Sequence, residues 1–440
     1  MLHAYLTLVA SLAVAEDWSS WRGPGNEGVA PTAAPTEWSD EEGVKWRIEL
    51  PGRGFSTPLV VGDLLVLTTA IPQGAPPAPA PEAEEEQDPG RGRGRGRGGP
   101  HGRSVPMVKN DFVVIAIDRG TGEIAWRTKL MEATPHEGYH RTYGSHASAS
   151  CVTDGERIFV PFGSFGLYAL DLEGEVVWKK DLGVQLAMRN SFGEGHTPVI
   201  EDGTLVLVLD QEEQSEILAL DAKTGGERWR LERDEPSAWS TPLVTTVGDV
   251  KQVVTSATNR VRSYRLSDGE LLWECGGLGL NAIPAVTRHE DLVLCMTGYR
   301  SPKLMAITLG GEGDLTGSEA VVWETTKATS YTASPVLADG RYYAVTDRGF
   351  ISCWDAATGE AHYVEQRLPR GSTLKSSPVA AGGYLYVPTE AGDVHLIPLG
   401  DEYTVATTNS LADQFFVSSP VVSRGELFLR SQTHLFCIAE

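Results

Sequence analysis

Residues Leu220-Asp221-Ala222-Lys223-Thr224-Gly225-Gly226-Glu227-Arg228-Trp229 close a unit that the chain repeats from end to end. The unit opens at Thr197-Pro198-Val199, where a small hydroxyl residue and a proline precede an apolar run. Comparable openings stand at Thr57-Pro58, Thr241-Pro242, Ile283-Pro284, Ser334-Pro335, Ser377-Pro378 and Ser419-Pro420, and a weaker one without proline at Ala149-Ser150. A repeat of roughly 42–50 residues, present about eight times, predicts a propeller or solenoid rather than one conventional core.

Each repeat contains short apolar runs that are typical of antiparallel strands. One copy reads Pro335-Val336-Leu337, then Arg341 to Thr346, then Phe350 to Trp354. Turn residues separate these β-branched and aromatic runs, which is the pattern of strands joined by hairpins. The pairs Asp202-Gly203 and Asp339-Gly340 suit tight turns that need positive φ. We therefore expect each repeat to be one four-stranded blade.

Three positions recur inside the repeat. A small residue stands at Ala116, Ala169, Ala219, Ser263, Ala306, Cys353 and Cys437, where we expect neighbouring sheets to press together. An acid follows two residues later at Asp118, Asp171, Asp221 and Asp355, and its carboxylate can accept N–H groups of the next turn. A large aromatic closes the copy at Trp126, Trp178, Trp229, Trp273, Trp323 and Tyr363. We expect these aromatics to wedge between blades, with the indole N–H bonded to a carbonyl.

The two ends of the chain complement one another. The last copy, Ser419 to Ile438, has inner strands but no outer one, whereas Val44 to Ile48 reads as an outer strand without a blade. Pairing the two closes the ring and leaves no open sheet edge. The predicted fold is therefore all-β: an eight-bladed β-propeller with four-stranded antiparallel blades and velcro closure by the N-terminal outer strand.

Composition limits the classes of function. The chain has 440 residues, a net charge of -22 and a pI near 4.9, which disfavours nucleic-acid and anionic-membrane binding. After the N-terminus no segment is long and apolar enough to span a membrane. The five cysteines are dispersed and lie mostly in strands, so they read as small buried thiols rather than a disulfide framework. We expect a monomer.

Three segments stand outside the repeats. Residues 1–15 resemble a signal peptide, with an apolar stretch from Ala4 to Val14 and an Ala13-Val14-Ala15 cleavage signal. Residues 16–37 form a leader, and the propeller is expected over 38–440. Residues 72–106, which include an Arg-Gly run, have no apolar pattern and are expected to be a disordered insertion in the first blade. The protein is thus predicted to be exported, to the periplasm or the cell exterior.

The repeat resembles the pyrroloquinoline-quinone-like (PQQ-like) β-propeller family. Residues 219–229 are similar to the family's blade signature, the Ser-Pro-Val openings at 334–336 and 377–379 agree with it, and the resemblance covers roughly residues 38–438. The family has two well-understood branches: quinoprotein dehydrogenases, which bind PQQ and calcium, and a cofactor-free scaffold of outer-membrane assembly. The dehydrogenases have a pair of adjacent cysteines and a set of calcium ligands, and this sequence matches neither. The resemblance therefore implies the quinoprotein-like fold, and we expect no cofactor.

One catalytic motif occurs literally. His136-Glu137-Gly138-Tyr139-His140 matches the H-E-x-x-H of zinc proteases, which needs a helix to place both histidines on one face. Gly138 disfavours a helix, and the segment links two blades, so we reject a protease. A looser metal site from His136, His140, His146 and His196 near the channel stays open beside the alternative of solvated loop histidines. We assign no catalytic residue and no metal ligand.

Ligand-binding candidates flank the inner strands, because propellers bind through the channel mouth and blade-connecting loops. The candidates are His140, His146, Arg189, Asn190, His196, Trp239, Asn259, Arg260, Tyr299, Arg300 and Tyr331. Arginines there could bind carboxylates and aromatics could offer flat faces. The alternative is that these groups pair with one another and with trapped water.

Two functions follow from this pattern. The first is an exported, non-catalytic binding or scaffold propeller whose partner is an envelope protein, a polysaccharide or a small molecule, and it is favoured because no catalytic constellation is present. The alternative is a divergent quinoprotein oxidoreductase that uses PQQ and calcium on an alcohol or sugar. Fold resemblance alone is a weak basis for the second.

Overall fold

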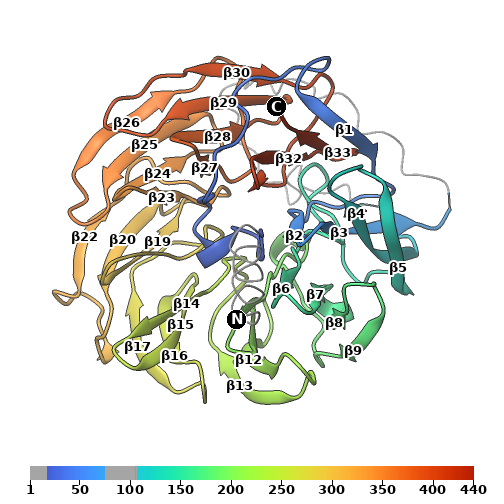
Figure 1. Ribbon diagram of the computed structural model, residues 1–440. Helices are drawn as coiled ribbons and strands as arrows, with labels where there is room; N and C mark the ends of the chain where they lie inside the picture. Colours follow the sequence, from blue (N-terminus) through green and yellow to red (C-terminus); the bar gives the residue numbers. More distant parts are fainter. Residues whose placement is uncertain (1–16, 75–104, 106) are drawn as a thin grey trace, which may run out of the picture.

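The described residues of this computed structural model, 17–74, 105 and 107–440, form eight antiparallel sheets arranged as the blades of a ring (Figure 1). The predicted eight-bladed β-propeller is confirmed. Seven sheets have four strands, and one has a fifth short strand. The signal peptide expected at residues 1–15 and most of the insertion expected at 72–106 lie outside the described residues.

The first four blades follow the chain. Blade 1 holds β2 (Leu59–Val61), β3 (Leu64–Pro72), β4 (Asn110–Asp118) and β5 (Ile124–Ala133). Blade 2 holds β6 (Val152–Thr153), β7 (Ile158–Pro161), β8 (Leu167–Leu170) and β9 (Val176–Lys180). Blade 3 holds β10 (Val199–Glu201), β11 (Thr204–Leu209), β12 (Ser215–Asp221) and β13 (Glu227–Arg233). Blade 4 holds β14 (Leu243–Val247), β15 (Val250–Ser256), β16 (Arg260–Arg265), β17 (Leu271–Gly276) and the added β21 (Gly313–Asp314).

The other four blades complete the ring. Blade 5 holds β18 (Thr287–His289), β19 (Leu292–Thr297), β20 (Lys303–Thr308) and β22 (Val321–Thr325). Blade 6 holds β23 (Val336–Ala338), β24 (Arg341–Val345), β25 (Phe350–Asp355) and β26 (Ala361–Arg367). Blade 7 holds β27 (Val379–Ala381), β28 (Tyr384–Pro388), β29 (Asp393–Pro398) and β30 (Thr407–Ser410). Blade 8 holds β31 (Val421–Ser423), β32 (Glu426–Arg430), β33 (His434–Ile438) and β1 (Val44–Glu49).

Three short 3-10 helices interrupt the loops: η1 (Pro24–Asn26), η2 (Gly163–Phe165) and η3 (Arg189–Ser191). The predicted hairpin turns are present, since Asp202 and Asp339 have φ of 47° and 51° and the glycines that follow have φ of 65° and 73°. The predicted acid turns are also confirmed, because the first oxygen of Asp118, Asp221 and Asp355 accepts the N–H group three residues later at 2.8, 2.9 and 2.8 Å. Local sequence therefore dictates both kinds of turn.

The register inside a blade explains the small residue of the repeat. Ala219 on β12 lies opposite Trp229 on β13, and the ladder shifts immediately afterwards. The same pairing joins Ala116 to Trp126, Ala169 to Trp178, Ser263 to Trp273, Ala306 to Trp323, Cys353 to Tyr363 and Cys437 to Trp46. All seven small residues are fully buried. A larger side chain at this position would collide with the packed blades.

The tryptophans join neighbouring blades as the sequence predicts, with one exception. Trp229 Nε1–H donates to Leu266 O of blade 4 at 2.9 Å, and Trp46, Trp126, Trp178 and Trp323 donate to the equivalent carbonyl of the next blade. Trp273 is fully buried, yet its N–H has no hydrogen-bond partner. In blade 5 the acid turn is replaced by a longer excursion that adds β21 parallel to β17, so the usual acceptor is displaced.

The ring is closed by the N-terminal strand, as predicted. β1 pairs antiparallel with β33, from Val44 opposite Ile438 to Glu49 opposite His434. On the same blade, Lys45 Nζ lies 2.6 Å from one oxygen of Glu426, and Arg119 of blade 1 binds the other oxygen at 2.5 Å. One carboxylate thus links the closing strand, blade 8 and blade 1.

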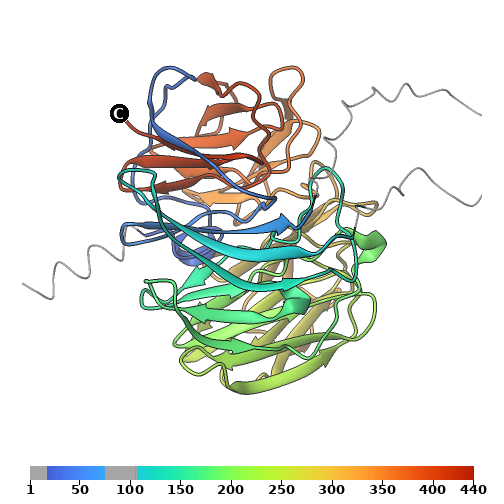
Figure 2. The same cartoon turned by 90° about the vertical axis from the view of Figure 1, so that its right-hand side faces the viewer.

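The leader, blue in Figures 1 and 2, begins at the inner strands and then crosses blade 7, where Trp38 N–H donates to Asn409 of the outer strand β30 at 3.0 Å. Trp18 bridges Val60 of blade 1 and Val29 bridges Ala380 of blade 7. Arg22 is 1% exposed and donates to Pro378 O at 2.7 Å and to Pro335 O at 2.9 Å. Because these carbonyls immediately precede the inner strands β27 and β23, Arg22 lies in the central channel.

Two other features bear on the predictions. All five cysteines are free and buried, which agrees with the prediction of small core thiols. In the described part of the chain no helix is long and apolar enough to cross a membrane.

Candidate functional site

The antiparallel blades give the ring two different faces. The turn face carries the short turns between first and second and between third and fourth strands, together with the leader. The loop face carries the connections between blades and the loops between second and third strands. The topology places all eleven sequence-predicted ligand residues on the loop face. Whether they bind a ligand remains a prediction.

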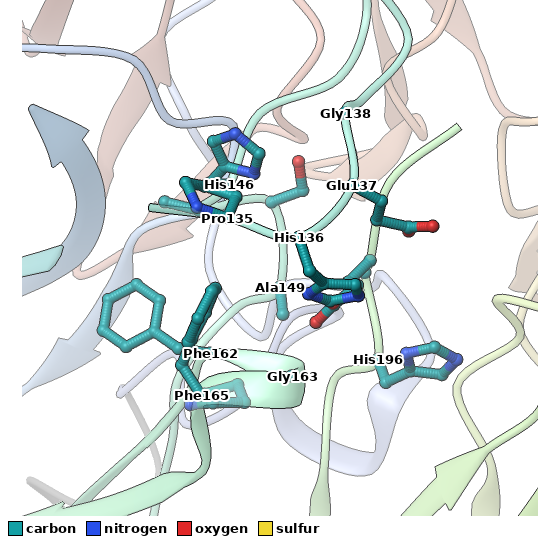
Figure 3. A pocket seen from close by; sticks show the side chains of 15 residues that line it. Pro135, His136, Glu137, Gly138, His146, Ala149, Phe162, Gly163, Phe165 and His196 are labelled. Atoms are coloured by element: carbon teal, nitrogen blue, oxygen red, sulfur yellow. The ribbon is translucent and has the colours of Figure 1, made fainter. Parts of the chain in front are cut away.

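A small cavity lies on the loop face where the connections of blades 1, 2 and 3 meet (Figure 3). Its volume is about 20 Å³, which suits one water-sized group rather than an organic molecule. Residues 135–138 and 146–149 come from the connection between β5 and β6, residues 161–165 from the loop that contains η2, and residues 194–196 from the connection between β9 and β10.

Glu194 is the most firmly held group of the cavity. Its two oxygens accept the Ser164 hydroxyl at 2.6 Å and the Ser164 N–H at 2.7 Å. This approach requires Gly163, because a Cβ at that position would overlap Glu194 Oε2, and φ there is 54°. Burial raises the pKa of Glu194 to about 7, although the Ser164 hydrogen bonds and His136 lower it. The cavity thus contains a carboxyl group poised to change charge near neutral pH.

His136 and Glu137 approach Glu194 from the connection of blades 1 and 2. His136 Nε2 lies 2.7 Å from Leu186 O and 3.8 Å from Glu194 Oε1. Glu137 Oε2 accepts the Met188 N–H at 3.0 Å, while its Oε1 is buried without a hydrogen-bond partner. One potential ligand atom from each of His136, Glu137 and Glu194 lies within 4.8 Å of the others.

Two further histidines line the cavity. Burial, with a smaller contribution from His136, lowers the pKa of His146 to about 4, and its ring packs edge-on against Tyr139 at 4.6 Å. His196 is 7% exposed, burial lowers its pKa, and its Nδ1 has no hydrogen-bond partner. Figure 3 shows Phe162 and Phe165 on the side opposite His196. Both histidines are therefore neutral at pH 7, and the aromatic wall keeps the local dielectric low.

A second group of predicted residues forms an aromatic patch. Tyr299 stacks on Tyr331 with ring centroids 5.1 Å apart, and the Arg300 guanidinium lies 5.1 Å from the Tyr299 ring. Asn281 is 1% exposed and donates to the Tyr331 hydroxyl at 3.3 Å. Arg300 and Asn281 have positive φ of 55° and 57°, a conformation that non-glycine residues adopt at a cost.

The remaining predicted residues take other contacts. Arg189 N–H donates to Ser237 Oγ at 2.9 Å, the neighbouring Asn190 is exposed, and Trp239 Nε1–H donates to Gly193 O at 2.9 Å. Asn259 is exposed beside Asp234, whose carbonyl it binds at 2.5 Å. Arg260 pairs with Asp314 and Glu274 at 3.1 and 3.2 Å, neither of which is a predicted ligand residue.

The middle of the loop face is crossed by residues that sequence reasoning missed. The Lys375 ammonium lies 4.6 Å from the Tyr143 ring, and it binds Asp347 at 2.6 Å. The ring of His140 stacks on that of Tyr143, and the two ring centroids lie 4.7 Å apart. Tyr143 follows blade 1 and Lys375 follows blade 6, so the contact spans the channel mouth. No short-range pattern connects residues so far apart.

The structure corrects the grouping of the histidines. Residues 136–140 are not helical, which agrees with the rejection of a zinc protease. Of His136, His140, His146 and His196, only His136 belongs to the three residues whose ligand atoms converge. His140 is instead stacked between Tyr143 and Phe192. Glu194 was missed, and its only sequence signal is its place as the fourteenth residue of the connection between β9 and β10.

Comparisons with known proteins agree with this architecture. A family model described as outer membrane protein assembly factor BamB matches residues 110–362 and 305–404, which together span more than half of the chain. A curated protein of that name from Yersinia pestis is 23% identical over 342 residues, covering 76% of this chain and 81% of the relative.

Two solved structures share the fold. BamB from Moraxella catarrhalis aligns with a TM-score of 0.52 at 15% identity, covering 74% of this chain and 88% of that one. Quinohemoprotein alcohol dehydrogenase from Comamonas testosteroni aligns with a TM-score of 0.61 at 10% identity, covering 98% and 81%. At these identities the structural likeness concerns the fold alone. The family model decides the relationship: this chain belongs to the PQQ-like propeller family described as outer membrane protein assembly factor BamB.

Proposed function

We propose that this protein is an exported, non-catalytic propeller scaffold that acts in outer-membrane protein assembly and binds an envelope protein with its loop face. The observation that carries the proposal is the match to assembly factors named BamB over about three quarters of the chain. Such a role needs a rigid ring and an accessible face rather than a catalytic constellation.

The two faces differ in a way that favours the loop face. Leader residues from Trp18 to Val29 contact inner strands from the turn-face side, and Trp38 reaches the outer strand of blade 7. The loop face instead leaves Asn190 and Arg300 exposed in its loops. The Tyr299–Tyr331 stack beside Arg300 offers a half-buried aromatic anchor of the kind that dominates protein interfaces.

Site-specific photocrosslinking in the native cell envelope tests the proposal. A photoreactive residue at position 300, on the loop face, is expected to capture an outer-membrane assembly protein. The matched control is position 223, an exposed residue in a turn of the opposite face, which is expected to capture none. Crosslinks from position 223 only, or an unchanged outer-membrane protein content after deletion of the gene, would contradict the proposal.

The quinoprotein alternative is tested separately. We expect no cofactor, because no two of the five cysteines are adjacent in the sequence, unlike the vicinal pair of quinoprotein alcohol dehydrogenases, and all five are free. Titration of the mature protein with PQQ and Ca²⁺, followed by absorbance and melting temperature, is expected to show no saturable change. A bound-quinone spectrum with turnover of an alcohol or sugar would establish the alternative.

A further inference from the structure

The geometry points to a binding site for one divalent first-row transition-metal ion in the cavity where blades 1, 2 and 3 meet. Zn²⁺ is the ion used to test it. Its protein ligands are His136, Glu137 and Glu194. The inference is independent of the scaffold role, since it rests on the cavity alone.

The donor set has the chemistry of a transition-metal site. One imidazole and two carboxylates provide nitrogen and oxygen ligands that Zn²⁺ and its neighbours accept. Calcium prefers six to eight oxygens, which this cavity does not gather around one point. The three ligand atoms lie within 4.8 Å of one another, and ligands of a common ion lie about 3 Å apart, so small side-chain rotations complete the site.

The two carboxyl groups of the cavity favour the binding of a cation. Two carboxylates lie close together, and among the described residues neither pairs with a lysine or arginine; their only ion-pair partner is His136, 3.8 Å from Glu194. Glu137 Oε1 is buried without a donor, and so is Nδ1 of the 93% buried His196 that lines the same cavity. Unpaired buried polar atoms are rare because each costs free energy.

Hydrogen bonds outside the cluster hold the ligands in place. Ser164 binds both oxygens of Glu194, and its hydroxyl also accepts the Leu186 N–H at 2.8 Å. The Leu186 carbonyl accepts Nε2–H of His136, which leaves Nδ1 as the ring atom that can bind an ion, and the Met188 N–H orients Glu137. Metal ligands characteristically have such partners, which set their orientation and basicity.

The dimensions and walls of the cavity favour a single ion. A volume of about 20 Å³ holds a metal ion or one water molecule and excludes an organic ligand. Phe162 is 4% exposed and, with Phe165, forms an apolar wall that strengthens the attraction between the ion and the carboxylates. A bound ion would fasten the β5–β6 and β9–β10 connections together next to η3, and so stiffen this sector of the loop face.

Metal titration of the full mature chain tests the site. The protein is freed of metal with a chelator and titrated with Zn²⁺ by calorimetry and by competition with a chromogenic chelator. We expect one saturable equivalent and a rise in melting temperature. Glu194→Gln and His136→Gln should each weaken binding by more than about 10-fold, and Ser164→Ala by about 10-fold.

Matched variants separate this site from adventitious binding. Glu390→Gln replaces a half-buried carboxyl on the same face, and His434→Gln replaces a histidine of blade 8. Both variants should bind Zn²⁺ as the wild type does. Circular dichroism verifies that each variant is folded, and Glu194→Gln is nearly isosteric. No saturable equivalent at millimolar Zn²⁺, equal loss in the control variants, or equal affinity for Ca²⁺ would overturn the inference.

Discussion

The rim of the ring and its loop face are built on opposite principles. At the rim the same contact recurs, a tryptophan that donates to the next blade and packs against a glycine of its acid turn, as Trp178 does with Ala222 O and Gly225. On the loop face each connection makes its own contacts: a cavity between blades 1 to 3, a tyrosine stack in blades 5 and 6, and the Tyr143–Lys375 contact across the mouth. Repetition thus carries stability, and departures from it mark the places where a partner or ion can bind.

The largest expected effect on stability comes from removing a tryptophan that joins two blades at the rim. Trp229→Ala removes a buried side chain, 8% exposed, that joins blades 3 and 4, and should lower the free energy of unfolding by about 3–5 kcal/mol. Urea denaturation followed by circular dichroism measures the loss. Val177→Ala, at a 52% exposed outer-strand position, is the control and should stay within about 0.5 kcal/mol of wild type. Equal losses of stability at both positions would show that the Trp229 side chain between blades 3 and 4 does not stabilise the ring.

The next effect concerns the charge of the loop-face cavity. Glu194 has a pKa of about 7 in the folded protein against 4.5 as a free side chain, so the folded state holds its proton more tightly. Metal-free wild type therefore loses stability as pH rises from 4.5 through 7, by up to about 3 kcal/mol. Glu194→Gln should remove this loss and be the more stable protein at pH 8. Chemical denaturation in the presence of chelator between pH 4.5 and 8 measures both, and parallel curves would contradict the prediction.

A glycine pair isolates the contact between turn and tryptophan. Gly225 and Gly203 have φ of 69° and 65°, so alanine is strained at both, but only at Gly225 would its Cβ meet Trp178, at 2.9 Å. Gly225→Ala should therefore cost about 1–3 kcal/mol more than Gly203→Ala. Thermal unfolding of the two variants gives the difference. Equal losses would mean that backbone strain alone requires these glycines.

The smallest effect tests the exception at the rim. Trp229→Phe removes an indole N–H that donates at 2.9 Å, whereas Trp273→Phe removes one that is buried without a partner. The first change should cost about 1 kcal/mol more than the second, because only the first breaks a hydrogen bond. Paired denaturation curves measure this, and a larger loss at Trp273 would show that β21 supplies an unrecognised partner.

Most of the architecture could be predicted because its causes are local. The acid turn before Gly225 and the Asp202-Gly203 hairpin depend on neighbouring residues, and recurrence of the pattern made the number of blades visible. The missing outer strand after Ile438 and the extra one at Val44 made ring closure predictable. The displaced acceptor of Trp273 was not predictable, because it results from a long connection in the next blade that folds back.

The sequence by itself determined the eight blades, the velcro, the buried thiols and the face that carries the irregular residues. Only the tertiary structure decided that Arg22 of the leader lies in the channel, that Tyr143 meets Lys375 across the mouth, and that Glu194 joins His136 and Glu137. The physical reason is the range of the contacts. Turn and strand patterns follow from steric and hydrogen-bonding preferences of adjacent residues. The cavity instead unites two blade connections and the loop of η2, which only the packing of blades 1 to 3 brings together.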